Sequence, residues 1–507
     1  MLVREPAFRP DDPVGARTHL GTAVPYANLR GAVPAGRIRT AYSRMPVTRE
    51  ANKVGHDRPA GREHAPVGIP SPFHFLRTGV DTGQRRRRRP RLRTTAVTVA
   101  LAAAAAGCPA SRPSDRTGSP PMMGERDLAS AVTRVNHTYQ IPDPLPAAEP
   151  GTLIAATDHG PDARLENARR WTVLYHSTNA RGADVAVSGT VLLPPGSPPR
   201  GGRPVVSWAH GTTGVADACA PSQSANLGSE AFAQELRALL RAGYAVTASD
   251  YPGLGTPGPH TYLVGADEGN AVADIVTAAR RLVPGLAPVW FAVGHSQGGQ
   301  AALFATHTER RTGGRRLGAA VALAPASHLE SMLAGVKASH VPSELSFAFY
   351  SLAGLSATEP AGHAADLRAL LGPSAAATAS RVIADCVTHS HPALKGVNTE
   401  RMLPLRGEQL RSMGERMGAY GDPDRSAITV PTLVIQGGAD QDVPPAWTDE
   451  VVAHLRRLGS PSLVYRTYPG AGHDQVLGQS ICDLLHFLHA HGGTRPGACA
   501  PPPSSHA

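Results

Sequence analysis

The pentapeptide Gly294-His295-Ser296-Gln297-Gly298 has the Gly-x-Ser-x-Gly spacing of a serine nucleophile. It follows a short apolar run, residues 290–293, and precedes a helical run that starts at Gln297. A sharp turn between strand and helix pushes a serine hydroxyl out at the edge of a sheet, and glycines on both sides leave room for that turn. The setting predicts that Ser296 is a nucleophile, against the alternative of a tight turn without catalysis.

A serine hydroxyl is a poor nucleophile at neutral pH and needs a histidine base that is oriented by a carboxylate. In folds with this turn the chain order is serine, then the acid, then histidine. Asp440 follows an apolar run at 432–436, and His473 follows another at 463–468. Both would therefore lie on loops at the carboxyl ends of strands. Ser296, Asp440 and His473 are the predicted catalytic residues.

Two other carboxylates compete for the role of the acid. Asp442 lies two residues after Asp440, and Asp474 adjoins His473. Asp440 is favoured because it is closer to the strand end and stands three residues before Val443-Pro444.

The oxyanion that forms when a nucleophile attacks a carbonyl needs two backbone N–H donors. The residue after the nucleophile, Gln297, supplies the first. The second should come from the loop after the third strand, where the segment 210–214 reads His-Gly-Thr-Thr-Gly, and Thr212 is the predicted donor. A glycine-rich loop could equally be a simple turn.

The elements that must position these residues alternate along the chain. Antiparallel early strands are predicted at 171–176 and 185–193, and buried strands at 205–209, 244–249, 290–293, 319–323, 432–436 and 463–468. Helices are predicted at 229–242, 267–282, 297–310 and 447–458. Such alternation predicts an α/β fold with a mostly parallel, doubly wound sheet.

Residues 326–428 interrupt the alternation after the run at 319–323, which counts as the sixth strand. About 100 residues are too many for a plain loop, and the segment is rich in Ala, Leu, Met and Ser. It is predicted to be a mostly helical cap over the carboxyl edge of the sheet, where ligands bind in open α/β folds. The whole domain is expected to span 139–490, followed by a tail at 491–507.

The formal charge of +10 is concentrated near the N-terminus. Residues 1–108 carry 19 Lys and Arg against 7 Asp and Glu, which leaves 31 against 33 for residues 109–507. The folded part is therefore almost neutral, which argues against a nucleic-acid partner.

An arginine run, residues 85–89, is followed by an apolar stretch at 94–106 and then by Gly107-Cys108. This order is typical of an export signal, predicted at 80–108, and the small residues before Cys108 resemble a lipoprotein cleavage box, although Ala105 stands where leucine is usual. A lipidated Cys108 would associate the protein with a membrane. Residues 1–79 are expected to be a disordered or spurious leader, with translation starting near Val80, and 109–138 a flexible tether.

Four further cysteines, Cys219, Cys386, Cys482 and Cys499, form an even number, which in an exported chain suits two disulfides. Three connectivities are open, and a bond between Cys482 and Cys499 would attach the tail to the last helix. Free buried thiols are the alternative, and no spacing suggests a zinc site.

Besides the serine turn, five segments resemble landmarks of the secretory lipase family, in order: 150–153 (Pro-Gly-Thr-Leu), 187–191 (Val-Ser-Gly-Thr-Val), 208–214 (Trp-Ala-His-Gly-Thr-Thr-Gly), 250–255 (Asp-Tyr-Pro-Gly-Leu-Gly) and 436–440 (Gln-Gly-Gly-Ala-Asp). The resemblance runs from about 139 to 490. It implies the α/β-hydrolase fold, hydrolysis of acylglycerols or related acyl esters outside the cell, and no cofactor or metal. It also implies a disulfide between Cys219 and Cys386. Segment 250–255 would shape the pocket wall or pack the fold.

Other functions remain open within the same fold. A short-chain acyl or aryl esterase, including a deacetylase at the cell envelope, is the main alternative to a triacylglycerol lipase, and a peptidase is a further one. Haloalkane chemistry would need an acid in place of Ser296, and a binding module conflicts with the intact set of Ser296, Asp440 and His473. Chain-length preference and oligomeric state are not determined by the sequence.

Overall fold

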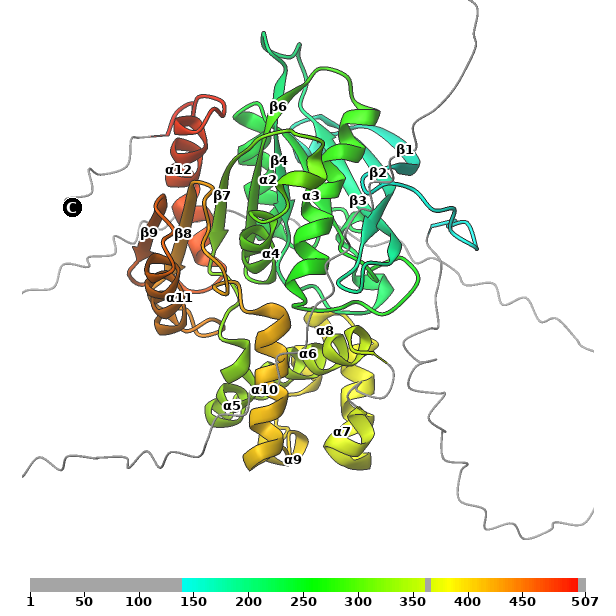
Figure 1. Cartoon of the computed structure of the whole chain (residues 1–507), viewed down its shortest axis with the longest axis vertical. Helices are drawn as coiled ribbons and strands as arrows, with labels where there is room; N and C mark the ends of the chain where they lie inside the picture. The colour runs from blue at the N-terminus through cyan, green and yellow to red at the C-terminus, as the bar shows by residue number, and fades with distance from the viewer. Residues whose placement is uncertain (1–138, 361–365, 500–507) are drawn as a thin grey trace, which may run out of the picture. The chain divides into compact units, whose positions relative to one another are not determined.

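The computed structural model describes residues 139–360 and 366–499. The expected leader, export signal with Cys108 and tether lie outside the described residues, as does the end of the tail. The described chain forms one nine-stranded sheet with helices on both faces and a further group of helices at one end (Figure 1). The strands are β1 (Leu153–Asp162), β2 (Ala168–Thr178), β3 (Asp184–Leu193), β4 (Arg203–Ala209), β5 (Ala245–Ser249), β6 (Leu286–His295), β7 (Leu317–Leu323), β8 (Thr432–Gly437) and β9 (Leu463–Tyr468).

The strand order is β1-β2-β3-β5-β4-β6-β7-β8-β9. The first three strands and the β3–β5 pair are antiparallel, whereas every pair from β5 to β9 is parallel. Every residue of β4, β5, β7 and β8 is buried, as expected for parallel strands that are covered on both faces. The predicted α/β-hydrolase fold, mostly parallel with helices on both sides, is confirmed.

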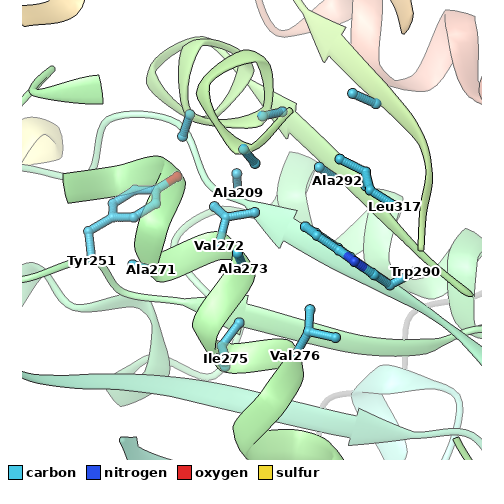
Figure 2. Packing of buried hydrophobic residues seen from close by; sticks show 14 of the residues in the cluster. Ala209, Tyr251, Ala271, Val272, Ala273, Ile275, Val276, Trp290, Ala292 and Leu317 are labelled. Carbon is cyan, nitrogen blue, oxygen red and sulfur yellow. The ribbon is translucent and has the colours of Figure 1, made fainter. Parts of the chain in front are cut away.

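Five helices cover the sheet. On one face, α3 (Gly265–Leu282), α4 (Gln297–Ala305) and α11 (Pro445–Arg457) contribute to one apolar core, and on the other α2 (Glu230–Arg241) and α12 (Gln475–Ala490) contribute to a second. Figure 2 shows Ile275 and Val276 of α3 in the first core, together with Trp290 of β6. All three are fully buried, and burying an aliphatic side chain of this size stabilises the fold by about 2 kcal/mol.

Among the described residues, six helices lie between β7 and β8. The segment 326–428 is called the cap below. Its helices are α5 (Leu329–Ser339), α6 (Leu345–Thr358), α7 (Leu367–Ile383), α8 (Val387–Ala393), α9 (Thr399–Met402) and α10 (Gly407–Gly421). The cap has its own apolar core, which includes Leu333, Phe349 and Met413. Its two ends are joined, because the Leu329 N–H donates to Asp422 Oδ1 over 2.7 Å.

Three elements differ from the predictions made from the sequence. Strand β9 lies at the predicted position, but the prediction that it is buried was wrong, because it is an edge strand with a neighbour on one side only and none of its residues is buried. Strand β1 was missed, and β7 is consequently the seventh strand rather than the sixth. The reason is that β1 is an edge strand whose residues are mostly exposed and include Gly160 and Pro161, so it lacks a clear apolar pattern.

Helix α4 ends at Ala305, so the predicted extent to Arg310 was wrong. The Thr306 and Thr308 hydroxyls donate to the carbonyls of Leu303 and Ala305, each over 2.6 Å. Threonine hydroxyls that bond to nearby carbonyls compete with the helical bonding pattern. Within the described residues, no helix has both the length and the apolar composition to span a membrane.

Candidate active site

The turn at Ser296 joins β6 to α4. Ser296 has φ 57° and ψ −119°, a strained conformation for a residue with a side chain. A Cβ atom on Gly298 would collide with the carbonyl group of Ala209, and one on Gly294 with the backbone of Gly298. Both flanking positions must therefore be glycine. The turn is held by the Ser296 N–H, which donates to the Leu323 carbonyl over 2.9 Å.

The loops after β8 and β9 bring the predicted acid and base together. His473 Nδ1 lies 2.8 Å from Asp440 Oδ2, and the Asp440 side chain is fully buried. Asp440 also accepts hydrogen bonds from the backbone N–H groups of Asp442 and Val443 and from the side chain of Gln436. These donors fix the Asp440 carboxylate next to the imidazole of His473.

The rival carboxylates are placed differently. Asp442 donates its backbone N–H to Asp440 and is an exposed residue at the lining of the cavity in front of Ser296. Asp474 is exposed at the start of α12. Of the three candidate acids, the structure pairs Asp440 with the ring of His473.

The charge state of His473 depends on opposing effects. Burial lowers its pKa, but the hydrogen bond to Asp440 and the negative charges of Asp440, Asp442 and Asp474 outweigh burial, so the pKa lies above the usual 6.5. Between the described residues Ser296 and His473 the structure gives no hydrogen bond. Such bonds are often long without substrate and tighten when substrate binds.

His295, the residue before Ser296, contacts His473. Its Nε2 lies 3.0 Å from the His473 carbonyl oxygen, and the two rings are 4.5 Å apart between centroids. Burial, followed by the proximity of His473, holds the pKa of His295 well below its usual range, so this ring is neutral and Nε2 is the donor. The sequence analysis gave His295 no role. Its position inside the serine turn was the available signal.

The two predicted oxyanion donors lie on the expected elements. Gln297 is the first residue of α4, so its N–H is among those that have no partner within a helix. Thr212 lies on the loop after β4, and its hydroxyl is 2.6 Å from that of Tyr262.

Two residues that were not predicted from the sequence contact the side-chain amide of Gln297. Its side-chain amide donates to Glu268 Oε1 over 2.7 Å and lies 3.0 Å from His260 Nε2. His260 Nδ1 faces the Pro252 carbonyl over 2.9 Å and must donate to it, so Nε2 is free to accept from the amide. Burial raises the pKa of Glu268 to about 8 and lowers that of His260 to about 3. Both residues are far from Gln297 in sequence, and no local pattern marks them.

Segment 250–255 packs against the oxyanion loop. The Tyr251 hydroxyl donates to the His210 carbonyl over 3.0 Å, and Asp250 accepts from the Ser222 N–H over 2.8 Å and from the Ser188 hydroxyl over 2.7 Å. Burial raises the pKa of Asp250 to about 6. These contacts favour a packing role for this segment over a role in the pocket wall.

A cavity of about 140 Å³ opens in front of Ser296. Cap residues form much of one wall, and the segment after β8 forms part of another. The described residues that line it include Tyr262, Leu263, Ser296, Leu329, Met332, Gly335, Val336, Phe347, Val443, Pro444 and Trp447. A mostly apolar cavity with a few polar groups is the usual form of a small-molecule site. No three His, Cys, Asp or Glu side chains among residues 139–360 and 366–499 converge as a metal site would need.

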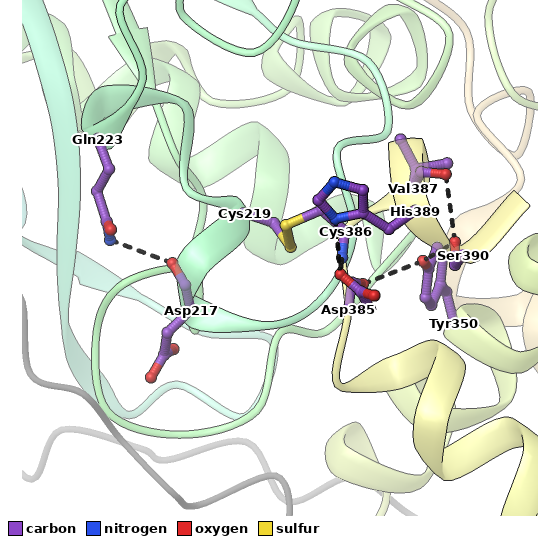
Figure 3. The surroundings of a disulfide bond; sticks show 9 residues. All are labelled: Asp217, Cys219, Gln223, Tyr350, Asp385, Cys386, Val387, His389 and Ser390. Carbon is purple, nitrogen blue, oxygen red and sulfur yellow. Dashed lines mark hydrogen bonds and ion pairs between the residues drawn. A yellow bond between two sulfur atoms is a disulfide. The ribbon is translucent and has the colours of Figure 1, made fainter. Parts of the chain in front are cut away.

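The described residues contain two disulfides, Cys219–Cys386, which the family resemblance implied, and Cys482–Cys499, which attaches the tail to α12. Figure 3 shows that the first joins the segment around Asp217 and Gln223 to the start of α8 in the cap. The Val387 N–H also donates to the Thr213 carbonyl over 2.9 Å. The cap is therefore attached directly to the loop that carries Thr212.

Part of this chain matches the sequence model of a known protein family, and solved structures share its fold. The family model Hydrolase_4, described as serine aminopeptidase S33, matches residues 226–478, a range that includes Ser296, Asp440 and His473. No curated protein matches the sequence.

Two solved structures illustrate the similarity in fold. The ligand-bound rice cell wall degrading esterase LipA from Xanthomonas oryzae is 18% identical with a TM-score of 0.55, over 66% of this chain and 95% of that chain. Candida antarctica lipase A in its closed state is 18% identical with a TM-score of 0.59, over 74% of this chain and 89% of that chain. Membership in the narrower secretory lipase family stays a prediction. From its sheet topology and these similarities, the chain belongs to the α/β-hydrolase superfamily.

Proposed function

We propose that the protein hydrolyses carboxylic esters, with Ser296 as nucleophile, His473 as general base and Asp440 as the group that orients the base. The observation that carries the proposal is the arrangement around the turn at Ser296. The strained serine faces a mostly apolar space, and the loop beside it carries a histidine bound to a buried carboxylate.

The proposed reaction has two steps. Ser296 Oγ attacks the ester carbonyl and gives its proton to His473 Nε2, while Nδ1 remains bound to Asp440. The tetrahedral intermediate then breaks its bond to the leaving alcohol, which takes the proton from His473, and an acyl group remains on Ser296. Water attacks this acyl-enzyme with the same histidine as base and releases the acid.

The oxyanion of each intermediate would be stabilised by the backbone N–H groups of Gln297 and Thr212. The hydrogen bonds from the Gln297 amide to Glu268 and His260 support this role, because they restrain the first residue of α4. Losing one such donor typically costs about a hundredfold or more in kcat.

The apolar lining of the cavity supports an acyl chain as the group that binds beside Ser296, as in a triacylglycerol lipase. The fold neighbours, an esterase and a lipase by their names, are consistent with either a long-chain or a short-chain ester. A deacetylase or short-chain esterase at the cell envelope is the alternative within this reaction class.

Aminopeptidase activity is a second candidate. The matched family model is described as a serine aminopeptidase, and two carboxylates, Glu344 and Asp442, lie among the lining residues of the cavity. A carboxylate in such a position could bind the amino group of a peptide.

The protein is proposed to act outside the cell. Two disulfides support this location, since such bonds persist in oxidising compartments. Export through the signal at 80–108 and acylation of Cys108 predict a mature N-terminus at Cys108 that carries lipid. Mass spectrometry of the protein from membranes and from the culture medium tests both.

The first experiment compares p-nitrophenyl esters of two to sixteen carbons with aminoacyl p-nitroanilides, using the purified protein and its Ser296→Ala variant. Ester hydrolysis that falls by about 10⁴-fold or more in the variant supports the proposal. Ser327→Ala, which alters another serine of the same cavity, is the matched control. Cleavage of the anilides with little ester hydrolysis would replace the proposal with the aminopeptidase.

A further inference from the structure

The charged side chains that line the cavity in front of Ser296 are all acidic. Among the described lining residues, Glu344 and Asp442 are the charged ones, and none is lysine, arginine or histidine. The remaining polar residues of the lining carry the hydroxyls of serine and tyrosine, the Gln441 amide and the indole N–H of Trp447. The cavity is therefore apolar with a negative charge.

The two carboxylates come from different parts of the molecule. Asp442 belongs to the loop after β8, two residues from the acid that orients His473, and its backbone N–H is bound to that acid over 3.0 Å. Glu344 belongs to the cap and accepts a hydrogen bond from the Ser339 hydroxyl over 2.6 Å. Core and cap each contribute one negative group.

The negative charge of Asp442 affects the pKa values of both Glu344 and His473. Burial, followed by the charge of Asp442, raises the pKa of Glu344. The Asp442 charge also contributes to the raised pKa of His473. The field of Asp442 therefore acts both on the base and on the cap side of the cavity.

No cation neutralises the pair. Within residues 139–360 and 366–499, neither Glu344 nor Asp442 takes part in any ion pair of the structure. By contrast, the buried Asp274 is paired with Arg311, and the buried Glu359 with Arg416. Glu344 is half-buried, whereas Asp442 is exposed. The charge of the half-buried Glu344 is screened less by solvent than a charge at an open surface, and no paired cation offsets the charge of either carboxylate.

We propose that Glu344 and Asp442 make this cavity select by charge: it accepts esters whose acyl group is uncharged or cationic and rejects those that carry a negative charge. This inference rests on the proposed ester hydrolysis and narrows its substrate class. The same charges assist turnover, because hydrolysis converts a neutral ester into an anionic acid. The product carboxylate is formed next to two like charges, which favour its release.

The test uses three p-nitrophenyl esters of similar length and different charge. They are the pentanoate, the hydrogen glutarate with a terminal carboxylate, and the 4-(trimethylammonio)butanoate. For the full chain at pH 8, kcat/KM for the glutarate should be at least about tenfold below that for the pentanoate, since each 1.4 kcal/mol of repulsion is a factor of ten. The cationic ester should be hydrolysed at least as well as the pentanoate.

The variants Glu344→Gln and Asp442→Asn should each reduce the ratio of pentanoate to glutarate by about threefold or more. Glu408→Gln removes the same charge from an exposed position on α10 of the cap and should leave this ratio unchanged. An unchanged ratio in both cavity variants, or equal hydrolysis of pentanoate and glutarate by the unaltered protein, overturns the proposal.

A binding measurement separates this proposal from the proposed reaction. Calorimetric titration of the Ser296→Ala protein compares hexanoate with hexyltrimethylammonium. Tighter binding of the cation, with the preference reduced by Glu344→Gln, supports charge selection even if no ester is cleaved. Equal binding of the two ions, or a preference that Glu344→Gln leaves intact, contradicts it, whatever the hydrolysis assays show.

Discussion

The two sides of the Ser296 cavity are built differently. On the core side, a polar network of Gln297, Glu268 and His260 is fully enclosed behind Ser296, and α4 approaches the end of β4 so closely that glycine is required at Gly298. On the cap side, the lining residues of α5 and α6 are mainly apolar and belong to a separate core. The cap is joined to the core by a disulfide and by backbone contacts.

We infer from this difference that the core side sets the geometry of the reaction and that the cap side sets the choice of substrate. Reaction geometry must hold to a fraction of an ångström, so the groups that react are supported by a sheet and by hydrogen bonds whose partners are all buried. Substrate choice depends on the shape and charge of a surface, which helices can vary without disturbing the strands. We expect changes on the core side to affect kcat and changes in the cap to affect the choice of ester.

The largest expected effect is at the core side. Asp440→Asn should lower kcat by about 10⁴-fold, because the amide cannot hold the His473 tautomer in which Nδ1 donates. Asp442→Asn should have a far smaller effect on hydrolysis of neutral esters. Steady-state kinetics on one ester measure both. Equal losses in the two variants would mean that the acid is wrongly assigned.

The disulfides should differ in their contributions to stability. Loop closure predicts about 5 kcal/mol for Cys219–Cys386, whose residues are 167 apart in sequence, and about 3 kcal/mol for Cys482–Cys499, with a separation of 17. Urea unfolding of the two double serine variants measures the difference. If the cap folds independently of the core, the variant without Cys219–Cys386 should unfold in two transitions, and the cap should unfold first, at low urea. Identical single transitions would contradict the separation of cap and core.

Two glycine substitutions, one on the core side and one in the cap, test whether tighter packing affects the two sides of the cavity differently. An added Cβ meets the Ala209 carbonyl group in Gly298→Ala and the Glu330 carbonyl group in Gly414→Ala, where α10 crosses α5 in the cap. Each should cost about 1–3 kcal/mol by overpacking. Only Gly298→Ala should lower kcat for p-nitrophenyl acetate, while Gly414→Ala should raise KM for longer esters. Loss of acetate hydrolysis in a folded Gly414→Ala protein would show that the cap also positions the reacting groups.

The smallest effect concerns pH. His473 must be neutral to act as base, and its pKa is raised above 6.5, so kcat/KM should rise with pH through a midpoint above 6.5. The Asp442 charge stabilises the imidazolium, and its removal in Asp442→Asn should move the midpoint to lower pH by a fraction of a unit. A pH profile with a neutral ester measures the shift. A midpoint that moves upward would exclude this electrostatic role.

The sequence identified the elements whose signals are local. Strands β4 to β9 were found because each is a short apolar run between turn residues, although β9 is an exposed edge strand and not a buried one. Ser296, Asp440 and His473 follow such strands. The pattern failed where burial is slight, as in β1, and where side chains bond to their own backbone, as after Ala305 in α4. In both places the local amino-acid composition does not reflect the contacts that the residues make in the folded protein.

The sequence by itself therefore determined the fold class, the strand-to-helix turn at Ser296 and the loops that carry the candidate acid and base, because backbone preferences and apolar spacing act over a few residues. Only the tertiary structure showed that Asp440, which the sequence favoured, is hydrogen-bonded to the His473 ring, that Glu268 and His260 contact the Gln297 amide, and that Glu344 lines the same cavity as Asp442. These contacts join residues that are far apart in the chain. They depend on how strands and helices pack, which no short stretch of sequence specifies.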